Sequence, residues 1–402
     1  MKDKLLNLAK SYEPQIAKFL ADIISIPSLS GEEKAVVDRI GQEMKKVGFD
    51  EVRVDGLGSV IGRIGKGKTV IAMDAHIDTV DVGNRDLWNF DPFKGFVRDG
   101  KVWGRGAADQ KGGMASMVYA GKLIKDLGLE GDYTLLVTGT VMEEDCDGLC
   151  WQYLIKEEKI RPDVCVLTEP TGLRIYRGHR GRMEMEVSVK GKSAHGSAPE
   201  RGDNAIYKMA PLTLKISELN EKLKNDPFLG KGTVVVSQIS SVGPSQCAVP
   251  DGCSIYLDRR LTAGETKEIA IKQIEEIVKQ AGGRVVVPKY EKAAYTGKVY
   301  PTEKYYPTWA IPEDHKAVKA AVQTCKELFG VVPAIDKWTF STNGVAICGM
   351  HNIPCIGFGP GFEEQAHAPD EWIPTEHLWK AAAFYAAFLK KFPPFVREGK
   401  GG

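Results

Sequence analysis

The stretch VIAMDAHID, residues 70–78, joins an apolar run of strand length to polar side chains at its end. Residues 70–73 predict a buried strand, and in open α/β sheets ligands bind beyond the carboxyl ends of the strands. His76 stands there as a candidate metal ligand. Asp78, two residues on, points the same way in an extended segment and could hold the second ring nitrogen of His76. The alternative is a surface histidine in a turn that leaves the strand.

Acidic residues follow two further apolar runs of strand length. Residues 133–140 precede Glu143 and Glu144, and residues 164–167 precede Glu169. Adjacent acids at a strand end are usually just solvated. At the mouth of a sheet, however, one of them can bind a metal while the other moves a proton, and metal-assisted hydrolysis needs both roles. Three strands that each deliver an acid or a histidine to one edge predict a metal site there.

A glycine-rich loop at residues 104–113 carries Asp109 and leads into a predicted helix at residues 112–127. Asp109 in such a loop is either a metal ligand or a turn or cap residue. A phosphate-binding loop is a rival interpretation, but Lys111 followed by two glycines has the wrong order for it. The phosphate-loop pattern does occur at residues 62–69, yet a strand follows there instead of the required helix.

Two more histidines lie in loops. His367 lies in the Gly-, Pro- and Ala-rich segment 357–369, and His195 lies in a turn at residues 191–199. Either could be a loop side chain without a role. On a mobile lid, His195 could instead donate a hydrogen bond to a developing oxyanion. The residues alone leave both alternatives open.

The order of helices and strands predicts an α/β fold with a mostly parallel mixed sheet flanked by helices. Residues 4–24 and 32–47 have helical periodicity, and Ser30 is expected to cap the second helix. Between residues 180 and 295 the order changes to βαββαβ, the ferredoxin-like arrangement. We therefore expect one α/β domain, residues 1–179 and 296–402, split by an inserted domain, residues 180–295.

The composition excludes several function classes. Charged residues make up 27% of the chain and the formal net charge is +1, so the basic footprint of a nucleic-acid-binding protein is absent from the sequence. The apolar runs are strand-sized and too short to cross a bilayer, which argues against a membrane role. The N-terminus lacks the apolar core of a signal peptide. The eight cysteines form no CxxC pair, and we expect free thiols in a reducing cytoplasm.

The full ordered set of motifs resembles the M20 family of zinc amidohydrolases and peptidases, with a finer likeness to a bacterial subgroup linked to selenium metabolism. The resemblance covers essentially the whole chain and implies a zinc-peptidase-like fold whose inserted domain serves as lid and dimerisation domain. It also implies two Zn²⁺, with Co²⁺ or Mn²⁺ as alternatives, and a cis peptide bond after Asp109. The implied ligands are His76, Asp109 and Glu169 for the first ion, and Asp109, Glu144 and His367 for the second.

The resemblance also implies roles for residues around the metals. Glu143 would be the general base and acid, and Asp78 would orient His76. His195 would match the lid histidine that, in the family, reaches the site of a partner subunit. Arg260 would bind a substrate carboxylate, since arginine pairs with carboxylates in a bidentate manner.

The chain departs from the family pattern at two places. Cys247 stands where the family often has asparagine, and residues 341–344, Ser-Thr-Asn-Gly, replace a common Gly-Gly-Thr-Asp or Gly-Gly-Thr-Ser stretch. Asn343 in this stretch is our candidate for a further substrate contact. The catalytic centre therefore matches the family, while the residues expected to select the substrate differ.

We expect a metal-dependent hydrolase that cleaves an amide bond of a small N-acyl or N-carbamoyl amino acid or a dipeptide. Its substrate carries a free carboxylate, and the protein forms a homodimer through the inserted domain. One alternative is a non-catalytic metal-binding or regulatory protein of the same fold, against which Glu143 and the full ligand set argue. The other is a zinc aminopeptidase of a related α/β fold, against which Arg260 and the insertion argue.

Overall fold

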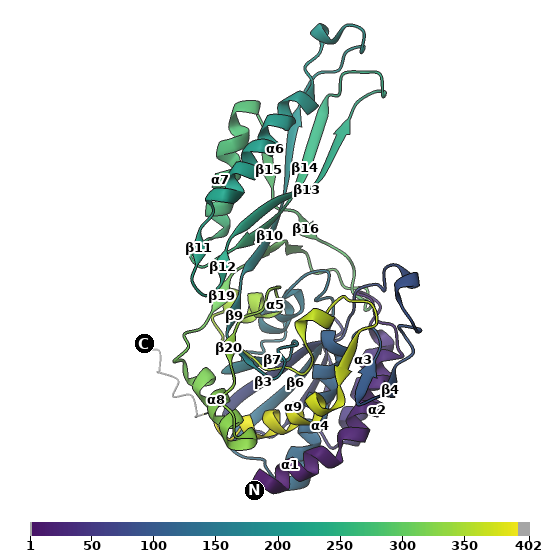
Figure 1. Ribbon diagram of the computed structural model, residues 1–402, viewed down its shortest axis with the longest axis vertical. Coiled ribbons are helices and arrows are strands. Elements are labelled where there is room, and N and C mark those ends of the chain that lie inside the picture. The colour runs from purple at the N-terminus through teal and green to yellow at the C-terminus, as the bar shows by residue number, and fades with distance from the viewer. Residues whose placement is uncertain (1, 393–402) are drawn as a thin grey trace.

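The computed structural model describes residues 2–392, and its main domain is built around an eight-stranded sheet (Figure 1). Four of the strand pairs, β3–β6, β3–β7, β7–β21 and β8–β20, are parallel. The pairs β1–β2, β2–β6 and β8–β21 are antiparallel, so the expected mostly parallel mixed sheet is confirmed. In spatial order the strands are β1 (Glu51–Val54), β2 (Val60–Ile64), β6 (Tyr133–Thr140), β3 (Thr69–His76), β7 (Val164–Leu167), β21 (Cys355–Gly357), β8 (Ile175–Tyr176) and β20 (Ile335–Asp336).

Helices cover both faces of this sheet. They are α1 (Lys2–Ser11), α2 (Glu13–Ile24), α3 (Lys34–Lys46), α4 (Gly112–Leu127), α5 (Leu149–Lys156), α8 (Lys316–Phe329) and α9 (Thr375–Phe388). Helices α1, α2, α4 and α9 pack against one another. Successive residues of β6 point to opposite faces of the sheet. On one face Gly139 packs on Met114 of α4. On the other face the Thr138 hydroxyl donates to Asp74, which also accepts from Asn343 near the start of α5.

Two expectations about the first helices are wrong. Residues 4–24 form two helices rather than one, because Pro14 lacks an N–H and suits only the first turn of α2. Ser30 does not cap α3, whose N-cap residue is Glu33. The Ser30 hydroxyl instead donates to Asp78 Oδ2 over 2.6 Å, so it supports the edge of the candidate metal site.

The inserted lobe rises from the main domain and has its own hydrophobic core (Figure 1). Its elements follow the expected βαββαβ order: β10 (Gly181–Lys190), α6 (Ala205–Lys222), β13 (Thr233–Val242), β14 (Gly252–Leu261), α7 (Lys267–Val278) and β15 (Arg284–Val286). The strands are antiparallel in the order β13-β14-β10-β15, and α6 and α7 pack on one face. A further strand, β18 (Tyr305–Tyr306), also pairs with β10, so the exact domain boundaries stay a prediction.

Short strands complete the fold. Their pairs are β4 (Phe96–Arg98) with β5 (Lys101–Trp103) and β22 (Trp372–Pro374), β11 (Asn225–Asp226) with β12 (Gly230–Lys231), β16 (Lys289–Tyr290) with β17 (Thr302–Glu303), and β9 (Gly178–His179) with β19 (Trp309–Ala310). The β9–β19 pair joins the two chain segments that connect the main domain to the lobe. None of the helices within residues 2–392 combines the length and apolar character that a bilayer crossing needs.

Candidate metal centre

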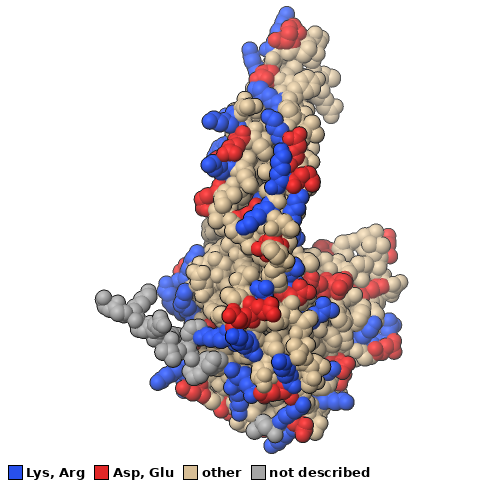
Figure 2. Space-filling model, turned by 60° about the vertical axis from the view of Figure 1, so that its left-hand side comes forward, with Lys and Arg blue, Asp and Glu red and all other residues tan. Residues whose placement is uncertain are grey.

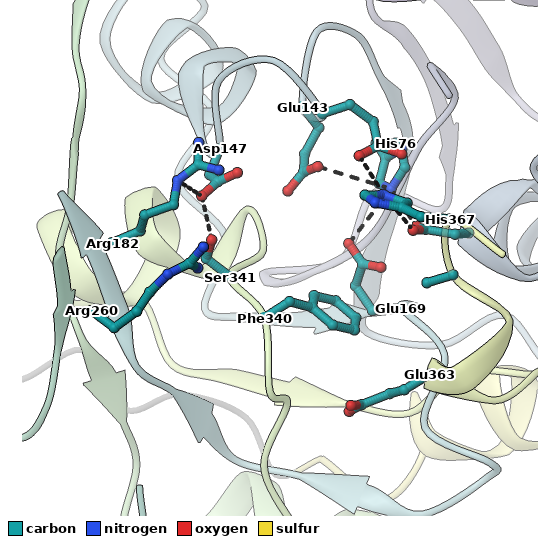
Figure 3. Close-up of a pocket in the computed structure, with 13 residues that line it drawn as sticks. His76, Glu143, Asp147, Glu169, Arg182, Arg260, Phe340, Ser341, Glu363 and His367 are labelled. Carbon is teal, nitrogen blue, oxygen red and sulfur yellow. Dashed lines mark hydrogen bonds and ion pairs between the residues drawn. The ribbon is translucent and has the colours of Figure 1, made fainter. Parts of the chain in front are cut away.

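A pocket of about 340 Å³ lies between the carboxyl end of the main sheet and the lobe (Figure 3). Figure 2 shows acidic side chains gathered in a band across the main domain beneath the lobe. Strand β3 and the segments after β6 and β7 supply side chains to the pocket, as the strand-end argument predicted. The candidate metal ligands and base that line it are His76, Asp109, Glu143, Glu144, Glu169 and His367.

Asp109 stands between two histidines. Its Oδ1 lies 2.9 Å from Nε2 of His76, and its Oδ2 lies 3.4 Å from Nε2 of His367. His367 Nε2 also lies 3.0 Å from Oε2 of Glu144. The two oxygens of one carboxylate therefore face different imidazoles, which is the arrangement that a ligand shared between two ions requires.

The remaining acids approach His76 from other sides. Its Nε2 lies 3.8 Å from Oε1 of Glu169 and 3.9 Å from Oε2 of Glu143. Two groups of potential ligand atoms lie within 4.8 Å of one another: His76 with Glu143 and Glu169, and His76 with Asp109 and Glu144. The first group contains Glu143, whereas the ligand set implied by the family resemblance has Asp109 with His76 and Glu169. The distances alone therefore also allow Glu143 to be a ligand.

The chemistry of these side chains fits divalent cations. Imidazole nitrogens and carboxylate oxygens are ligands that zinc accepts. Glu143 Oε1 and Glu169 Oε2 are buried and have no hydrogen-bond partner among the described residues, an arrangement that costs free energy unless a cation compensates it. The donor set and its unpaired oxygens therefore make this pocket a candidate metal site.

The pKa values report the same excess of negative charge. Burial raises the pKa of Glu143 and of Glu169 well above the ordinary value for glutamate, and neighbouring carboxylates add to both shifts. Burial alone would lower the pKa of His76, but hydrogen bonds to Asp109 and Asp78 and the charges of the two glutamates raise it well above its ordinary value. The protein by itself attracts positive charge to this point.

Asp78 connects His76 to the segment that bears the adjacent glutamates. His76 Nδ1 donates to the main-chain oxygen of Asp78 over 2.9 Å, whereas the Asp78 carboxylate Oδ1 lies 3.6 Å away. That carboxylate accepts from the backbone N–H groups of Glu143 (3.2 Å) and Glu144 (3.0 Å) and from the hydroxyl of Ser30. The hydrogen bond to His76 that was expected from the Asp78 side chain is thus made by the Asp78 main chain. The Asp78 side chain instead holds the segment that carries Glu143 and Glu144.

Glu371 holds the loop that carries Asp109. Its Oε2 accepts from Arg105 Nη1 (2.9 Å) and the N–H of Gly106 (2.8 Å), and its Oε1 accepts from the N–H groups of Ala108 (2.7 Å) and Asp109 (3.0 Å). The peptide bond after Asp109 is cis, as the resemblance implied. The sequence reasoning missed Glu371, because nothing in the chain marks an acid between an aspartate and a tryptophan as buried.

The lysine of this glycine-rich loop is not available to a phosphate group. Lys111 is fully buried, and its Nζ donates to the carbonyl oxygens of Ile23 (2.9 Å) and Ile26 (3.0 Å) at the end of α2. Burial lowers the pKa of this lysine to about 7. The structure therefore gives Lys111 a role in fixing the loop against α2 and gives no support to a phosphate-binding loop.

Two arginines reach the pocket from the lobe. Arg260 binds the two oxygens of Asp258 through Nε and Nη2, each over 2.9 Å. Arg182 stands directly opposite Arg260 in the β10–β14 pairing, and its Nε lies 3.5 Å from Oδ2 of Asp147, which also accepts from the Ser341 hydroxyl. Arg182 and Asp147 escaped the sequence analysis, which named Ser341 only as part of the stretch 341–344, since only the strand register and the approach of the two domains bring the three together.

Asn343 is buried and does not line the pocket, so this structure gives its predicted role in substrate binding no support. Its side-chain amide donates to Asp74 Oδ2 over 2.8 Å and to Thr140 Oγ1 over 3.1 Å, and accepts from the N–H of Gly148 over 3.0 Å. Because these bonds occupy the amide inside the core, no donor is left for a ligand. Ser341, two residues earlier, lines the pocket instead.

His195 lies far from the metal site of its own chain. It follows β10, whose ten residues lead away from the main domain and span about 30 Å. Its ring is exposed and hydrogen-bonds the Ser197 hydroxyl over 2.7 Å. Cys247, the residue that replaces the family's asparagine, lies beside this loop and accepts from the N–H of Gly196. A role for His195 at a metal centre requires the centre of another chain.

Comparison with known proteins agrees with this geometry. The family described as Peptidase family M20/M25/M40 matches residues 72–391. The uncharacterized protein YgeY of Escherichia coli K12 is 57% identical over 95% of this chain and 96% of its own. A probable succinyl-diaminopimelate desuccinylase of Staphylococcus epidermidis is 33% identical over 89% of this chain and 92% of its own.

Among solved structures, the Bacillus subtilis YxeP protein, a dinuclear metal-binding peptidase of the M20 family, superposes with a TM-score of 0.69. It is 17% identical and covers 94% of this chain and 98% of its own, so it shows the fold. The matched family and these relatives confirm the resemblance seen in the sequence. The chain therefore belongs to the peptidase family M20/M25/M40 and shares the metal-dependent hydrolase character of that family.

Proposed function

We propose that the protein hydrolyses an amide bond of a small N-acyl or N-carbamoyl amino acid or dipeptide at a centre of two zinc ions. The observation that carries this proposal is the placement of Asp109, whose two carboxylate oxygens face His76 and His367 separately. His76 and Glu169 complete the first set of ligands, and Glu144 and His367 complete the second.

The charge of the pocket supports two divalent ions rather than one. Six carboxyl groups and two guanidinium groups line it, so the acids outnumber the arginines by four; three of the acids belong to the ligand sets, and two divalent cations would offset these three and Glu143. Cobalt or manganese could replace zinc in such a set of nitrogen and oxygen ligands. The dinuclear metal site named for the Bacillus subtilis neighbour agrees with this number.

The residues of this chain suit hydrolysis. When bound, the ions would polarise the scissile carbonyl and lower the pKa of a water molecule. Glu143, which is close to both ligand sets, takes a proton from the attacking water and passes it to the leaving amine. Arg260 orients the substrate by donating to its carboxylate from Nη1, since Asp258 holds Nε and Nη2.

The identity of the acyl group is the next question about the substrate. The Staphylococcus epidermidis relative is described as a desuccinylase, which supports an N-acyl amino acid. The presence of Glu143 beside a full ligand set favours an enzyme over a non-catalytic metal-binding member of the family. Arg260 favours a substrate with a free carboxylate over the substrates of a general aminopeptidase.

A metal-exchange assay tests the proposed function. Treatment with 1,10-phenanthroline should lower the hydrolysis of a panel of N-acetyl, N-succinyl and N-carbamoyl amino acids and dipeptides by about 100-fold or more, and Zn²⁺ should restore it. Untreated protein carried through the same dialysis is the control. Hydrolysis that survives complete metal removal, or a zinc-loaded protein that cleaves none of the panel, would refute the proposal.

We also propose a homodimer formed through the lobe. Strand β13 is an edge strand, and it exposes Val235, Ile239 and Val242, while Tyr207 and Leu214 of α6 are exposed beside it. An apolar edge strand of this kind can pair with that of a second copy. Such a dimer would also give His195 a metal centre to reach.

Light scattering should therefore report about twice the chain mass of 44.1 kDa at micromolar concentration. Ile239→Lys should shift the protein to the monomer, because it places a charge on the exposed edge, whereas Val54→Lys on β1 of the main sheet should not. A monomeric wild-type protein would contradict the dimer.

A cytoplasmic location is a further proposal. All eight cysteines lie within the described residues and none of them is paired, which suits a reducing compartment.

A further inference from the structure

One acid that lines the metal pocket has no place in the proposed mechanism. Three of the six carboxylates belong to the ligand sets, and Glu143 moves the proton. Asp147 has partners of its own, since Arg182 lies 3.5 Å away and the Ser341 hydroxyl donates to it. Glu363, the first residue of a short helical turn at Glu363–Gln365, is the acid that remains.

The described residues do not neutralise Glu363. Its Oε2 accepts from the Thr339 hydroxyl over 2.9 Å, and the Thr339 N–H and the Tyr176 hydroxyl also interact with the carboxyl group, but all of these partners are uncharged. Within residues 2–392 it forms no ion pair with a lysine, an arginine or a histidine. Burial raises the pKa of this carboxyl above its ordinary value. A half-buried carboxylate without a cation is unfavourable, and a cationic ligand would relieve it.

The position of Glu363 in the pocket suggests which part of a ligand it meets. Figure 3 shows Glu363 apart from Arg182, Arg260 and Asp147, with the metal-ligand side of the pocket above it. The ring of Phe340 stands between the arginines and Glu363 in this view and lines the same pocket. A pocket wall that offers both a carboxylate and an aromatic ring is a favourable setting for an ammonium group.

We propose that Glu363 is a specificity-determining residue that binds a protonated amino group on the acyl side of the scissile amide. This inference rests on the proposed function, in which Arg260 holds the carboxylate and the amide lies at the metals. The amine must then belong to the half of the substrate that points away from the lobe. The preferred substrates are therefore aminoacyl amino acids, that is, dipeptides and their analogues, rather than amino acids with an uncharged acyl group.

A matched pair of substrates isolates this ammonium group. Glycyl-L-alanine and N-acetyl-L-alanine differ only in the amino group, which glycyl-L-alanine carries on the carbon next to the scissile carbonyl. We expect the zinc-loaded protein to favour glycyl-L-alanine by about 10-fold or more in kcat/KM, the gain typical of a charged hydrogen bond. Glu363→Gln should bring the ratio of the two kcat/KM values to about one, and Glu363→Asp should retain part of the preference. Glu364→Gln, which changes the exposed neighbour, should leave the ratio as it is in the wild type.

Two outcomes in this assay would overturn the inference. One is a wild-type protein that favours N-acetyl-L-alanine or shows no preference. The other is a Glu363→Gln protein that loses the same factor on both substrates, because that result would assign Glu363 a purely structural role.

A binding measurement separates this inference from the proposed function. Calorimetric titration of the zinc-loaded Glu143→Gln protein should show that glycyl-L-alanine binds more tightly than N-acetyl-L-alanine, and adding Glu363→Gln should remove the difference. Replacing Glu143 also removes the other acid that could attract the ammonium group. If no amide is cleaved but the binding preference is present, the proposed reaction fails and the role of Glu363 stands. If glycyl-L-alanine does not bind more tightly, the role of Glu363 fails whatever the reaction is.

Discussion

Replacing Glu143 by glutamine lowers kcat by about 10²- to 10⁴-fold and leaves the zinc content unchanged, if Glu143 is the proton carrier. The amide keeps the size of the side chain but cannot accept the proton of the attacking water. The side chain is nearly inaccessible to solvent, and its Oε1 has no partner among the described residues, so the change breaks no hydrogen bond of Oε1 and weakens only the 3.9 Å approach of Oε2 to His76. Steady-state kinetics together with elemental analysis of the same sample measures both effects.

The adjacent glutamate provides the control. Glu144 lies 3.0 Å from His367 and belongs to the second ligand set, so Glu144→Gln should lose zinc as well as activity. The contrast between neighbouring residues matters, because the geometry also allows Glu143 to bind a metal with His76 and Glu169. A Glu143→Gln protein that loses zinc would make this residue a ligand. One that keeps the wild-type kcat would remove it from the mechanism.

Replacing Asp109 by asparagine should weaken the binding of both ions together, by about 100-fold or more in affinity. An asparagine has one acceptor oxygen, and its NH₂ group would face one of the two histidines. Titration of the metal-free protein with Zn²⁺ measures the affinity. His367→Ala is the matched comparison, since it removes a ligand that belongs to the second ion alone.

The fold should survive the Asp109→Asn change. Glu371 holds the loop through the backbone N–H groups of Gly106, Ala108 and Asp109, which the substitution does not alter. His76 lies 2.9 Å from Asp109 and holds the pKa of this carboxyl below its ordinary value, so the metal-free variant should melt somewhat below the metal-free wild type while it stays folded. A metal-free variant that is unfolded at room temperature would show that Asp109 is needed for the fold and not only for the metals.

The candidate ligands could be predicted because strand ends obey a simple rule. Residues 70–73, 133–140 and 164–167 predict buried strands from their apolar character, and parallel neighbours bring their carboxyl ends to one edge. His76 and the acids after β6 and β7 therefore meet in the structure much as expected. The glycine-rich loop could be assigned to this edge only through the family resemblance, since Asp109 is held there by Glu371, 262 residues further along the chain.

The parts that could not be predicted depend on contacts between distant segments. Arg182 meets Asp147 only because the lobe closes over the main domain at that point. Asn343 was expected in the pocket, but the sequence does not reveal that Asp74, an acidic residue buried inside the sheet, accepts a hydrogen bond from its amide. Glu363 follows the same logic, because an acid in a loop is usually solvated and only the folded chain shows it without a cation.

The number of zinc ions bound per chain tests the central claim most directly. After equilibration with buffered Zn²⁺ and removal of the excess, inductively coupled plasma mass spectrometry should find two ions per wild-type chain. At the same free Zn²⁺, the Asp109→Asn protein should have lost both ions together, because a shared carboxylate holds them. One ion in the wild type, or two retained by the variant, would contradict a two-metal centre bridged by Asp109.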